Sequence, residues 1–418
     1  MTFDELVRDT LREQAEYVRP APADLAGRVL ARRARHRTRG LTAATVVTVV
    51  AVAAAVATPT MLDSGHGPDR HARHDGSADI PAVTGVESHP SQSPPRDRIS
   101  AGNQVLAAYY STRDVRQPDH DVVQTRTYSL LDPDTGRYAT DSRWSDVVVA
   151  PGLRTAAVLE QALPARRVGI LDLGTGRVTH WIPVPQGAAA LDLSPDGSKL
   201  VVTTYDQNPN RLFWAKRMSV TDAKGTSYQP QPEYSRTGFS VIDLPSGAAR
   251  WHALAPDTSM PQGVPVGSGA ALQFNDDGTL LTELRMAEPH LVFLSLDGTT
   301  VPAPAKEKHE DPELAPAGLS PDGKLMAGDF AGEGSKTATE LLDPVTGKRA
   351  ALLRGQKLLA WVDDRHLIAW DIAPGGNEFG TRLVMVTVGS SKEVPLSGAR
   401  HTKQEESPAR WEAVFAHR

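Results

Sequence analysis

The first forty residues carry apolar and polar side chains with the period of a helix. Between Thr2 and Val18 the apolar positions recur near helical spacing, and Asp4, Arg8 and Arg12 fall largely on the other side. Thr2, with Glu5 three positions later, has the pattern of a helix-capping box. The pattern predicts an amphipathic helix within a segment 1–40, and its apolar face is a candidate surface for a partner: Phe3, Leu6, Val7 and Leu11.

A second pattern begins at Leu41, where polar side chains almost disappear. Residues 41–57 contain no charge, Gly or Pro, and the low-charge stretch continues to Leu62. About 20 such residues are needed to cross a bilayer. Six arginines crowd residues 28–39, and Asp63 follows the stretch, so the positive-inside rule predicts a single transmembrane helix over 41–62 with a cytosolic N-terminus. The alternative is a cleaved signal peptide, because Ala55-Val56-Ala57 offers small residues at a suitable spacing.

Residues 63–98 are rich in Gly, Pro, Ser, His and Asp and have almost no apolar periodicity. Such a composition predicts a disordered linker between the membrane and the rest of the chain. The histidines of this segment, His66, His71 and His74, are metal-ligand types, but they also suit a solvated linker.

From Ile99 onward, short apolar runs alternate with two kinds of turn. In the first kind, an apolar run leads into Pro-Asp-Gly and a second apolar run, as in Leu193–Leu200 and Leu319–Leu325, with a degenerate copy at Phe274–Leu280. Proline presets the first central dihedral of the turn, aspartate caps its backbone, and glycine takes a positive φ. Each copy therefore predicts a β-hairpin.

The second kind of turn follows an apolar run that ends in aspartate and precedes a glycine. These aspartates lie 40, 71, 54 and 46 residues apart, at Asp132, Asp172, Asp243, Asp297 and Asp343. Apart from the interval of 71 residues, which contains an insertion, these spacings match the length of a four-stranded propeller blade. Two turn classes that alternate in register predict an all-β protein: a β-propeller over 99–418, with six blades favoured and seven as the alternative.

The region resembles the β-propellers of the WD-repeat and Tol-system type, although the Trp-Asp dipeptide of true WD repeats is missing. The first blade has no obvious innermost strand before Asn103. Arg410–Ala416 resembles Arg143–Ala150, which is the expected innermost strand of the second blade. We therefore predict that the C-terminal strand joins the first blade and closes the ring, pairing an otherwise exposed edge.

Composition narrows the chemistry that the chain can perform. Cysteine is absent, which excludes disulfides, thiolate catalysis and Cys-based zinc sites. A formal net charge of -5 over 418 residues gives no global footprint for nucleic acid. The catalytic motifs with a fixed spacing, such as a nucleophile elbow, a P-loop or a zincin helix, do not occur. We expect no enzyme activity, no cofactor and no bound metal, with a propeller-type hydrolase or oxidoreductase of the cell envelope as the alternative.

The longest predicted connection, Asp206–Thr237, mixes aromatic and cationic residues, which are the types that anchor interfaces. Shorter variable loops are expected at Thr112–Gln124 and Ala373–Thr381. The candidate binding residues of the longest loop are Phe213, Trp214, Arg217, Tyr228 and Tyr234. The alternative is a surface β-extension whose aromatics pack on their own blade. Three pairs of aspartates, 132/134, 276/277 and 363/364, fall in predicted turns and are expected to cap backbone there.

The N-terminal pattern, with a Pro-Ala-Pro break, Asp24–Leu30 and an arginine-rich anchor, resembles actinobacterial membrane-anchored propellers, some of which accompany extracytoplasmic-function sigma factors. The first hypothesis is a binding and sensing module: an extracytoplasmic propeller that binds an envelope protein or small ligand, and residues 1–40 that contact a cytosolic partner, for which the resemblance suggests a sigma-factor pathway. A scaffold for envelope assembly without a cytosolic partner is the second hypothesis, and the envelope enzyme is the third.

Overall fold

The structure, a computed structural model, describes residues 83–222, 225–256, 269–285, 288–332, 337–376, 380–401 and 410–418. The predicted cytosolic segment, its face Phe3, Leu6, Val7 and Leu11, the predicted span 41–62 and the three linker histidines lie outside these residues. Within the described ranges, no helix has the length and apolarity needed to cross a bilayer. The described part is all-β, and its 26 strands form five sheets.

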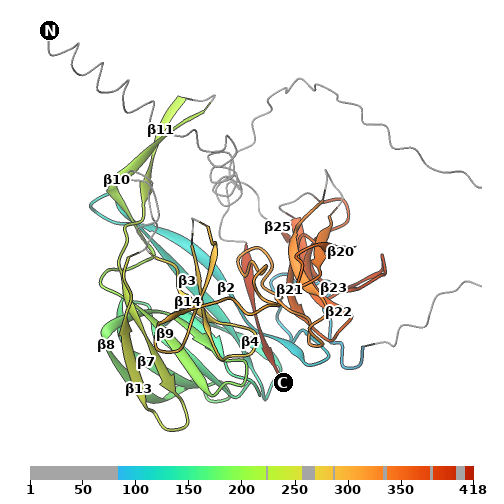
Figure 1. The fold of residues 1–418 in the computed structure, drawn as a ribbon, viewed down its shortest axis with the longest axis horizontal. Coiled ribbons are helices and arrows are strands. Elements are labelled where there is room, and N and C mark those ends of the chain that lie inside the picture. Colours follow the sequence, from blue (N-terminus) through green and yellow to red (C-terminus); the bar gives the residue numbers. More distant parts are fainter. Residues whose placement is uncertain are drawn as a thin grey trace, which may run out of the picture.

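Figure 1 shows the arrangement of the strands. They group into six successive units of antiparallel strands, because the long strand β8 pairs with β7 in one unit and with β9 in the next, so that one of the five sheets contains two units. Unit 1 contains β26 (Trp411–His417), β2 (Gln104–Arg116), β3 (Val122–Asp132) and β4 (Arg137–Asp141), with the short β1 (Ser100–Ala101) against the start of β2. Unit 2 contains β5 (Trp144–Val149), β6 (Thr155–Glu160), β7 (Ala165–Asp172) and the first part of β8 (Arg177–Leu193). Unit 3 contains the rest of β8 with β9 (Lys199–Tyr205), β12 (Arg236–Asp243) and β13 (Ala249–Ala253).

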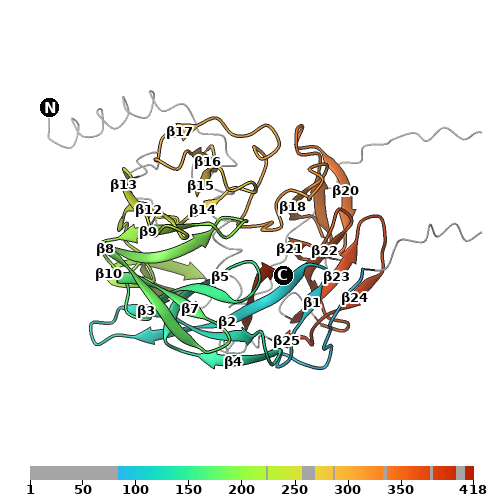
Figure 2. The same cartoon turned by 90° about the horizontal axis from the view of Figure 1, so that it is seen from below.

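The second half of the chain repeats this plan with shorter strands. Unit 4 contains β14 (Leu272–Phe274), β15 (Leu281–Leu284), β16 (Leu291–Leu294) and β17 (Thr300–Val301). Unit 5 contains β18 (Met326–Phe330), β19 (Thr339–Leu342) and β20 (Arg349–Leu353), and Leu319 bridges to β18 on its inner side. Unit 6 contains β21 (Lys357–Trp361), β22 (His366–Ile372), β23 (Gly380–Thr387) and β24 (Glu393–Pro395), with β25 (Arg400–His401) beside β23. The units follow one another around a ring in chain order (Figure 2), which is a β-propeller-like arrangement.

The predicted turns join the predicted strands, and their chemistry is visible in the hydrogen bonds. Between β8 and β9, Asp196 accepts the backbone N–H of Ser198 at 3.0 Å, and Gly197 takes a φ of 69°. An added Cβ at Gly197 would come within 2.8 Å of the Pro151 ring, so the turn also packs on the neighbouring unit. Between β7 and β8, Asp172 accepts the N–H of Thr175 at 2.7 Å. Short-range residue types therefore fix where each hairpin forms.

The predicted closure by the C-terminal strand is confirmed. Strand β26 pairs antiparallel with β2 in a register that runs from Gln104 opposite His417 to Ser111 opposite Trp411. Residues 83–98, which fall in the predicted linker, pack across the same junction: the backbone N–H of His89 donates to Leu396 O, and that of Gly398 donates to Gln92 O, both at 2.8 Å. The packed part of the chain therefore starts upstream of Ile99.

Five apolar clusters form the core of the described residues, and each lies between neighbouring units. Leu131 and Val147 belong to the cluster between units 1 and 2, and Ile182 and Val202 to that between units 2 and 3. In the third cluster, Phe239 of unit 3 packs with side chains of unit 4. Burial between these sheets holds the first four units side by side.

The two remaining clusters complete the ring on the other side. The cluster between units 5 and 6 contains Leu341 of β19 and Leu358 of β21. The cluster between units 6 and 1 contains Trp370 of β22, Leu106 of β2 and Trp411 of the closing strand β26. The closing strand therefore contributes to the core as well as to the pairing of β2.

Candidate functional site

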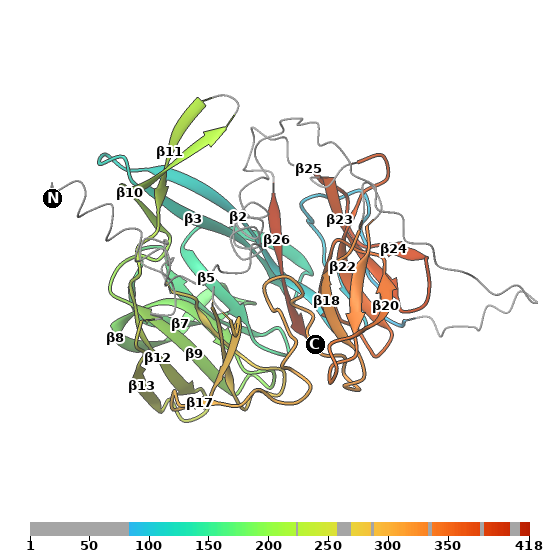
Figure 3. The same ribbon diagram turned by 45° about the horizontal axis from the view of Figure 1, so that its top comes forward.

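A two-stranded arm projects from the ring at the connection between β9 and β12. Its strands are β10 (Arg211–Asp222) and β11 (Gly225–Gln231), which pair antiparallel (Figures 1 and 3). The arm belongs by sequence to unit 3, but its base pairs with the start of β3 in unit 1, Arg211 opposite Val123 and Leu212 opposite Val122. The two long connections expected from the sequence, Asp206–Thr237 and Thr112–Gln124, therefore meet in one structure.

Two aspartates at the tip of the β2–β3 hairpin clamp the base of the arm. The Arg211 guanidinium pairs with Asp121 at 2.7 Å and with Asp119 at 2.5 Å. Asp121 also accepts the backbone N–H of Trp214 at 2.7 Å, and its side chain is 8% exposed. Burial of this carboxyl opposes ionisation, but the Trp214 N–H and the Arg211 guanidinium outweigh it and lower the pKa of Asp121. An ionised Asp121 is thus an integral part of the clamp.

Beyond the clamp, one guanidinium lies near two aromatic rings of the arm. Arg217 is 5.3 Å from the centre of the Trp214 ring and 5.5 Å from that of Tyr228, which lies on the opposite strand of the arm. Arg211 lies 5.3 Å from the Phe213 ring. Tyr228 is 55% exposed, the largest exposed fraction among the large apolar side chains that the structure describes as exposed. A cation that lies near two aromatic rings, one of them open to solvent, has the composition of a protein-interface anchor.

Four of the five binding residues proposed from the sequence meet on this arm: Phe213, Trp214, Arg217 and Tyr228. Tyr234 instead lies against Gly269, where an added Cβ would come within 3.1 Å of the Tyr234 ring. It also lies beside Arg236, whose side chain pairs with the buried Glu283 of unit 4. Sequence reasoning did not single out Asp119 and Asp121. The run Pro118-Asp119-His120-Asp121 in a predicted variable loop was the available signal.

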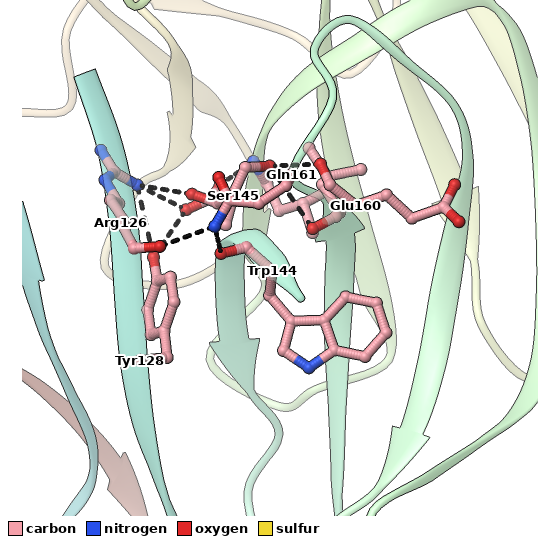
Figure 4. Close-up of polar contacts among 9 residues, drawn as sticks. Arg126, Tyr128, Trp144, Ser145, Glu160 and Gln161 are labelled. Atoms are coloured by element: carbon pink, nitrogen blue, oxygen red, sulfur yellow. Dashed lines mark hydrogen bonds and ion pairs between the residues drawn. The ribbon is translucent and has the colours of Figure 1, made fainter. Parts of the chain in front are cut away.

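A polar network joins β3 of unit 1 to the inner strand β5 of unit 2 (Figure 4). The Arg126 guanidinium pairs with Asp146 at 2.9 Å, and the Tyr128 hydroxyl approaches the same carboxylate oxygen at 3.3 Å. The Gln161 amide donates to the carbonyl oxygens of Arg126, at 2.6 Å, and of Trp144, at 2.9 Å. These groups satisfy one another, and Tyr128 is almost fully buried. The network therefore explains how the two units are joined.

A surface hollow of about 640 Å³ adjoins this network and is lined by Arg143, Trp144, Glu160, Arg177, Val178 and Trp181. Arg143 lies 4.8 Å from the Trp144 ring, and Arg167 lies 4.0 Å from the Trp181 ring while pairing with Glu160 at 2.8 Å. Trp144 is only 3% exposed. The aromatic surface here is already covered by the chain's own side chains, so the arm is the stronger candidate.

Aspartates on the inner strands, or in the turn that directly follows one, form a repeated contact from one unit to the next. Asp146 accepts the backbone N–H of Leu191 at 2.8 Å, Asp192 accepts that of Phe274 at 2.7 Å, and Asp276 accepts that of Leu319 at 2.8 Å. Burial raises the pKa of Asp192 to about 7. Among the described residues, no three His, Asp or Glu side chains form a group suited to a metal ion.

In each of the three aspartate pairs, one member caps its turn as predicted. Asp132 accepts the N–H of Asp134 at 2.9 Å, Asp277 that of Thr279 at 2.9 Å, and Asp363 that of Arg365 at 2.8 Å. Asp276 differs, because its carboxylate leaves its own turn and accepts a backbone N–H of the next unit. Local turn chemistry predicted the position of this residue but not its partner.

Neither a protein-family model nor a curated protein matches the sequence. Solved structures with distant similarity include TolB from Acinetobacter baumannii, at 16% identity, a TM-score of 0.34 and coverage of 71% of this chain and 67% of that one. Oligogalacturonate lyase from Vibrio parahaemolyticus is similar at 12% identity and a TM-score of 0.40, over 74% of this chain and 85% of the other. Hydrazine synthase from Kuenenia stuttgartiensis matches at 12% identity and a TM-score of 0.33, over 60% of this chain, which spans 65% of that chain's length. These are distant likenesses of a β-propeller-like all-β fold, and the description of the fold rests on the strand pairing above.

Proposed function

We propose that the protein is a six-bladed β-propeller that acts as a non-enzymatic binding module, and that its β10–β11 arm is the surface that binds an envelope protein. In this proposal a single N-terminal membrane helix holds the propeller outside the cytosol. Residues 1–40 then offer their apolar face to a cytosolic partner, for which a sigma-factor pathway is the candidate suggested by the resemblance.

The observation that carries the binding proposal is the exposed Tyr228 ring with Arg217 near both it and Trp214, on an arm whose base is fixed by two ion pairs. Aromatic and arginine side chains dominate the energy of protein interfaces. A rigid base also reduces the conformational entropy that binding would otherwise cost. The clamp reaches from unit 1 to unit 3, so the arm is braced by two parts of the ring.

Site-directed photo-cross-linking in intact cells tests this use of the arm. We expect a photoreactive residue at position 228 to give a discrete protein adduct. Leu352, which is 51% exposed on β20, provides the control position on another unit and should not give that adduct. Arg217→Ala should lower the adduct yield from position 228 about tenfold, the effect of losing 1–2 kcal/mol at an interface anchor. The same adducts from positions 228 and 352, or a yield that Arg217→Ala leaves unchanged, would contradict the proposal.

Membrane fractionation tests the anchor separately. The full chain should remain with membranes after alkaline extraction and should keep its native N-terminus, whereas a cleaved leader would release a soluble product with a new N-terminus. Replacing residues 1–40 by an unrelated basic segment that preserves topology then tests the cytosolic half. Signalling should be lost while the cross-link at position 228 persists. An unchanged signal would favour the scaffold hypothesis instead.

A further inference from the structure

The junction between units 4 and 5 differs in composition from the other five. Apolar clusters occur between units 1 and 2, 2 and 3, 3 and 4, 5 and 6, and 6 and 1. Among the described residues, none of these clusters includes side chains of both unit 4 and unit 5. Acidic side chains occupy this junction instead, and they come from the β14–β15 turn and from the connection between β17 and β18.

Three carboxyl groups make the contacts at this junction. Asp276 of unit 4 accepts the backbone N–H of Leu319, on the inner side of unit 5, at 2.8 Å. The carboxyl of Glu310 lies beside the same Asp276 carboxyl, and the two groups interact. Glu307, which is 6% exposed, accepts the side-chain amide of Asn275 at 3.1 Å. Gly318 makes this approach possible, because an added Cβ there would lie 2.8 Å from an oxygen of Asp276.

Two adjacent carboxyl groups in a buried place favour the state in which one of them carries a proton, because two negative charges there repel each other. The groups that face the pair reinforce this preference, because Asp277 and Glu307 add negative charge. The nearby basic side chains lie against other turns: Lys306 against Gly323 and His309 against Gly347. The second oxygen of Glu310 is buried and has no hydrogen-bond partner, which suits a neutral carboxyl better than a carboxylate.

We propose that the junction between units 4 and 5 is a proton-dependent joint of the ring, closed while Asp276 and Glu310 share a proton and loosened when that proton is lost. Burial and the neighbouring negative charges raise the pKa of both Asp276 and Glu310. A group whose pKa is raised on folding contributes stability at low pH, and this contribution is lost as the pH rises. The joint is therefore expected to open in alkaline conditions and to stay closed in acidic ones. Local opening of one junction leaves the apolar clusters of the other five in place.

Hydrogen–deuterium exchange of the full chain in detergent measures this opening directly. After correction for the chemical rate, protection of the segment around Leu319 should fall at least tenfold between about pH 6 and about pH 9. The segment around Leu358, in the apolar junction between units 5 and 6, serves as the internal control and should not change. Glu310→Gln keeps a neutral donor for Asp276 at every pH, so protection around Leu319 should then be independent of pH.

Wild-type protection around Leu319 that does not depend on pH would overturn the proposal, as would a Glu310→Gln variant that loses protection in parallel with the wild type. Restoration of protection at high pH by millimolar calcium would also overturn it, in favour of a cation site, because carboxylate oxygens are the ligands that calcium prefers. If Glu310→Gln does not fold, Asp276→Asn provides the same comparison, since its amide oxygen can still accept the Leu319 N–H. The cross-linking test of the arm is independent of each of these outcomes.

Discussion

Replacing Asp192 by Asn should remove a pH dependence of stability that originates between units 3 and 4. The carboxyl of Asp192 lies on the inner part of β8 and accepts the backbone N–H of Phe274 at 2.7 Å. Burial is the dominant cause that raises its pKa from the ordinary 3.8 to about 7. The folded protein therefore holds a proton that the unfolded chain has already lost across this interval of pH. Stability should fall as the pH rises from about 4 to about 7 and then level off.

The size of the effect follows from the two pKa values. A change from 3.8 to about 7, at 1.36 kcal/mol for each tenfold change in affinity for the proton, corresponds to about 4 kcal/mol of unfolding free energy. Part of the residue remains accessible to solvent, which reduces the effect. We therefore expect wild type to lose about 2–4 kcal/mol relative to Asp192→Asn between about pH 4 and about pH 8. Asparagine has nearly the same shape and still accepts the Phe274 N–H, so it removes the ionisation without leaving a cavity.

Urea unfolding of both proteins at a series of pH values measures this difference. At each pH, the unfolding free energy of wild type is compared with that of Asp192→Asn. The change of this difference with pH is the useful quantity, because the constant effect of the substitution on stability cancels. Asp297→Asn is a matched control on an exposed turn, where the Ser295 hydroxyl lowers the pKa of Asp297 to about 2. Its contribution is present at neutral pH and is lost only in acid, so its profile should run parallel to wild type above about pH 5. Parallel profiles for wild type and Asp192→Asn would refute the reasoning.

Two further predictions concern the closure and the arm. Deleting residues 411–418 removes β26 and leaves the inner edge of β2 unpaired. We therefore expect the protein to aggregate, or to lose its cooperative thermal transition in calorimetry. A truncated chain that melts like the full one would contradict the closure. Asp121→Ala removes the acceptor of the Trp214 N–H and one of the two carboxylates that Arg211 contacts. Trypsin should therefore cut the arm about tenfold faster, while the thermal midpoint of the ring stays the same. An unchanged rate of cleavage would show that Asp119 suffices as a clamp.

The sequence predicts most of the hairpins because their causes are local. A Pro-Asp-Gly or Thr-Gly turn between apolar runs restricts the backbone to one geometry, as the positive φ values of Gly197 and Gly278 illustrate. The closing strand was also predictable, since Arg410–Ala416 repeats the residue pattern of another inner strand. Contacts between distant segments were not predictable in this way. The pairing of β10 with β3 depends on two loops about 90 residues apart that reach the same place only after the ring has formed.

The arm shows the same division between local and distant causes. The aromatic and cationic residue types of the long insertion indicated a binding surface, and Trp214, Arg217 and Tyr228 do lie together. Their mutual position follows from the register of β10 and β11, which places Tyr228 opposite Ser219 and leaves its ring on the exposed part of the hairpin. Residue types alone do not set the register of this hairpin, so they could not separate Tyr234 from the group.

The inner-strand aspartates explain why pH should act on junctions rather than on whole units. Asp146, Asp192 and Asp276 perform the same task, since each accepts a backbone N–H of the following unit. Their surroundings differ. Asp146 is paired with Arg126, and Asp276 lies beside a second carboxyl. Asp192 is buried, and none of the groups that shift its pKa is a cation. Burial or a second carboxyl favours the protonated form of a carboxyl. We therefore expect the contacts on both sides of unit 4 to be sensitive to pH, which makes unit 4 the part of the ring that a rise in pH should loosen first.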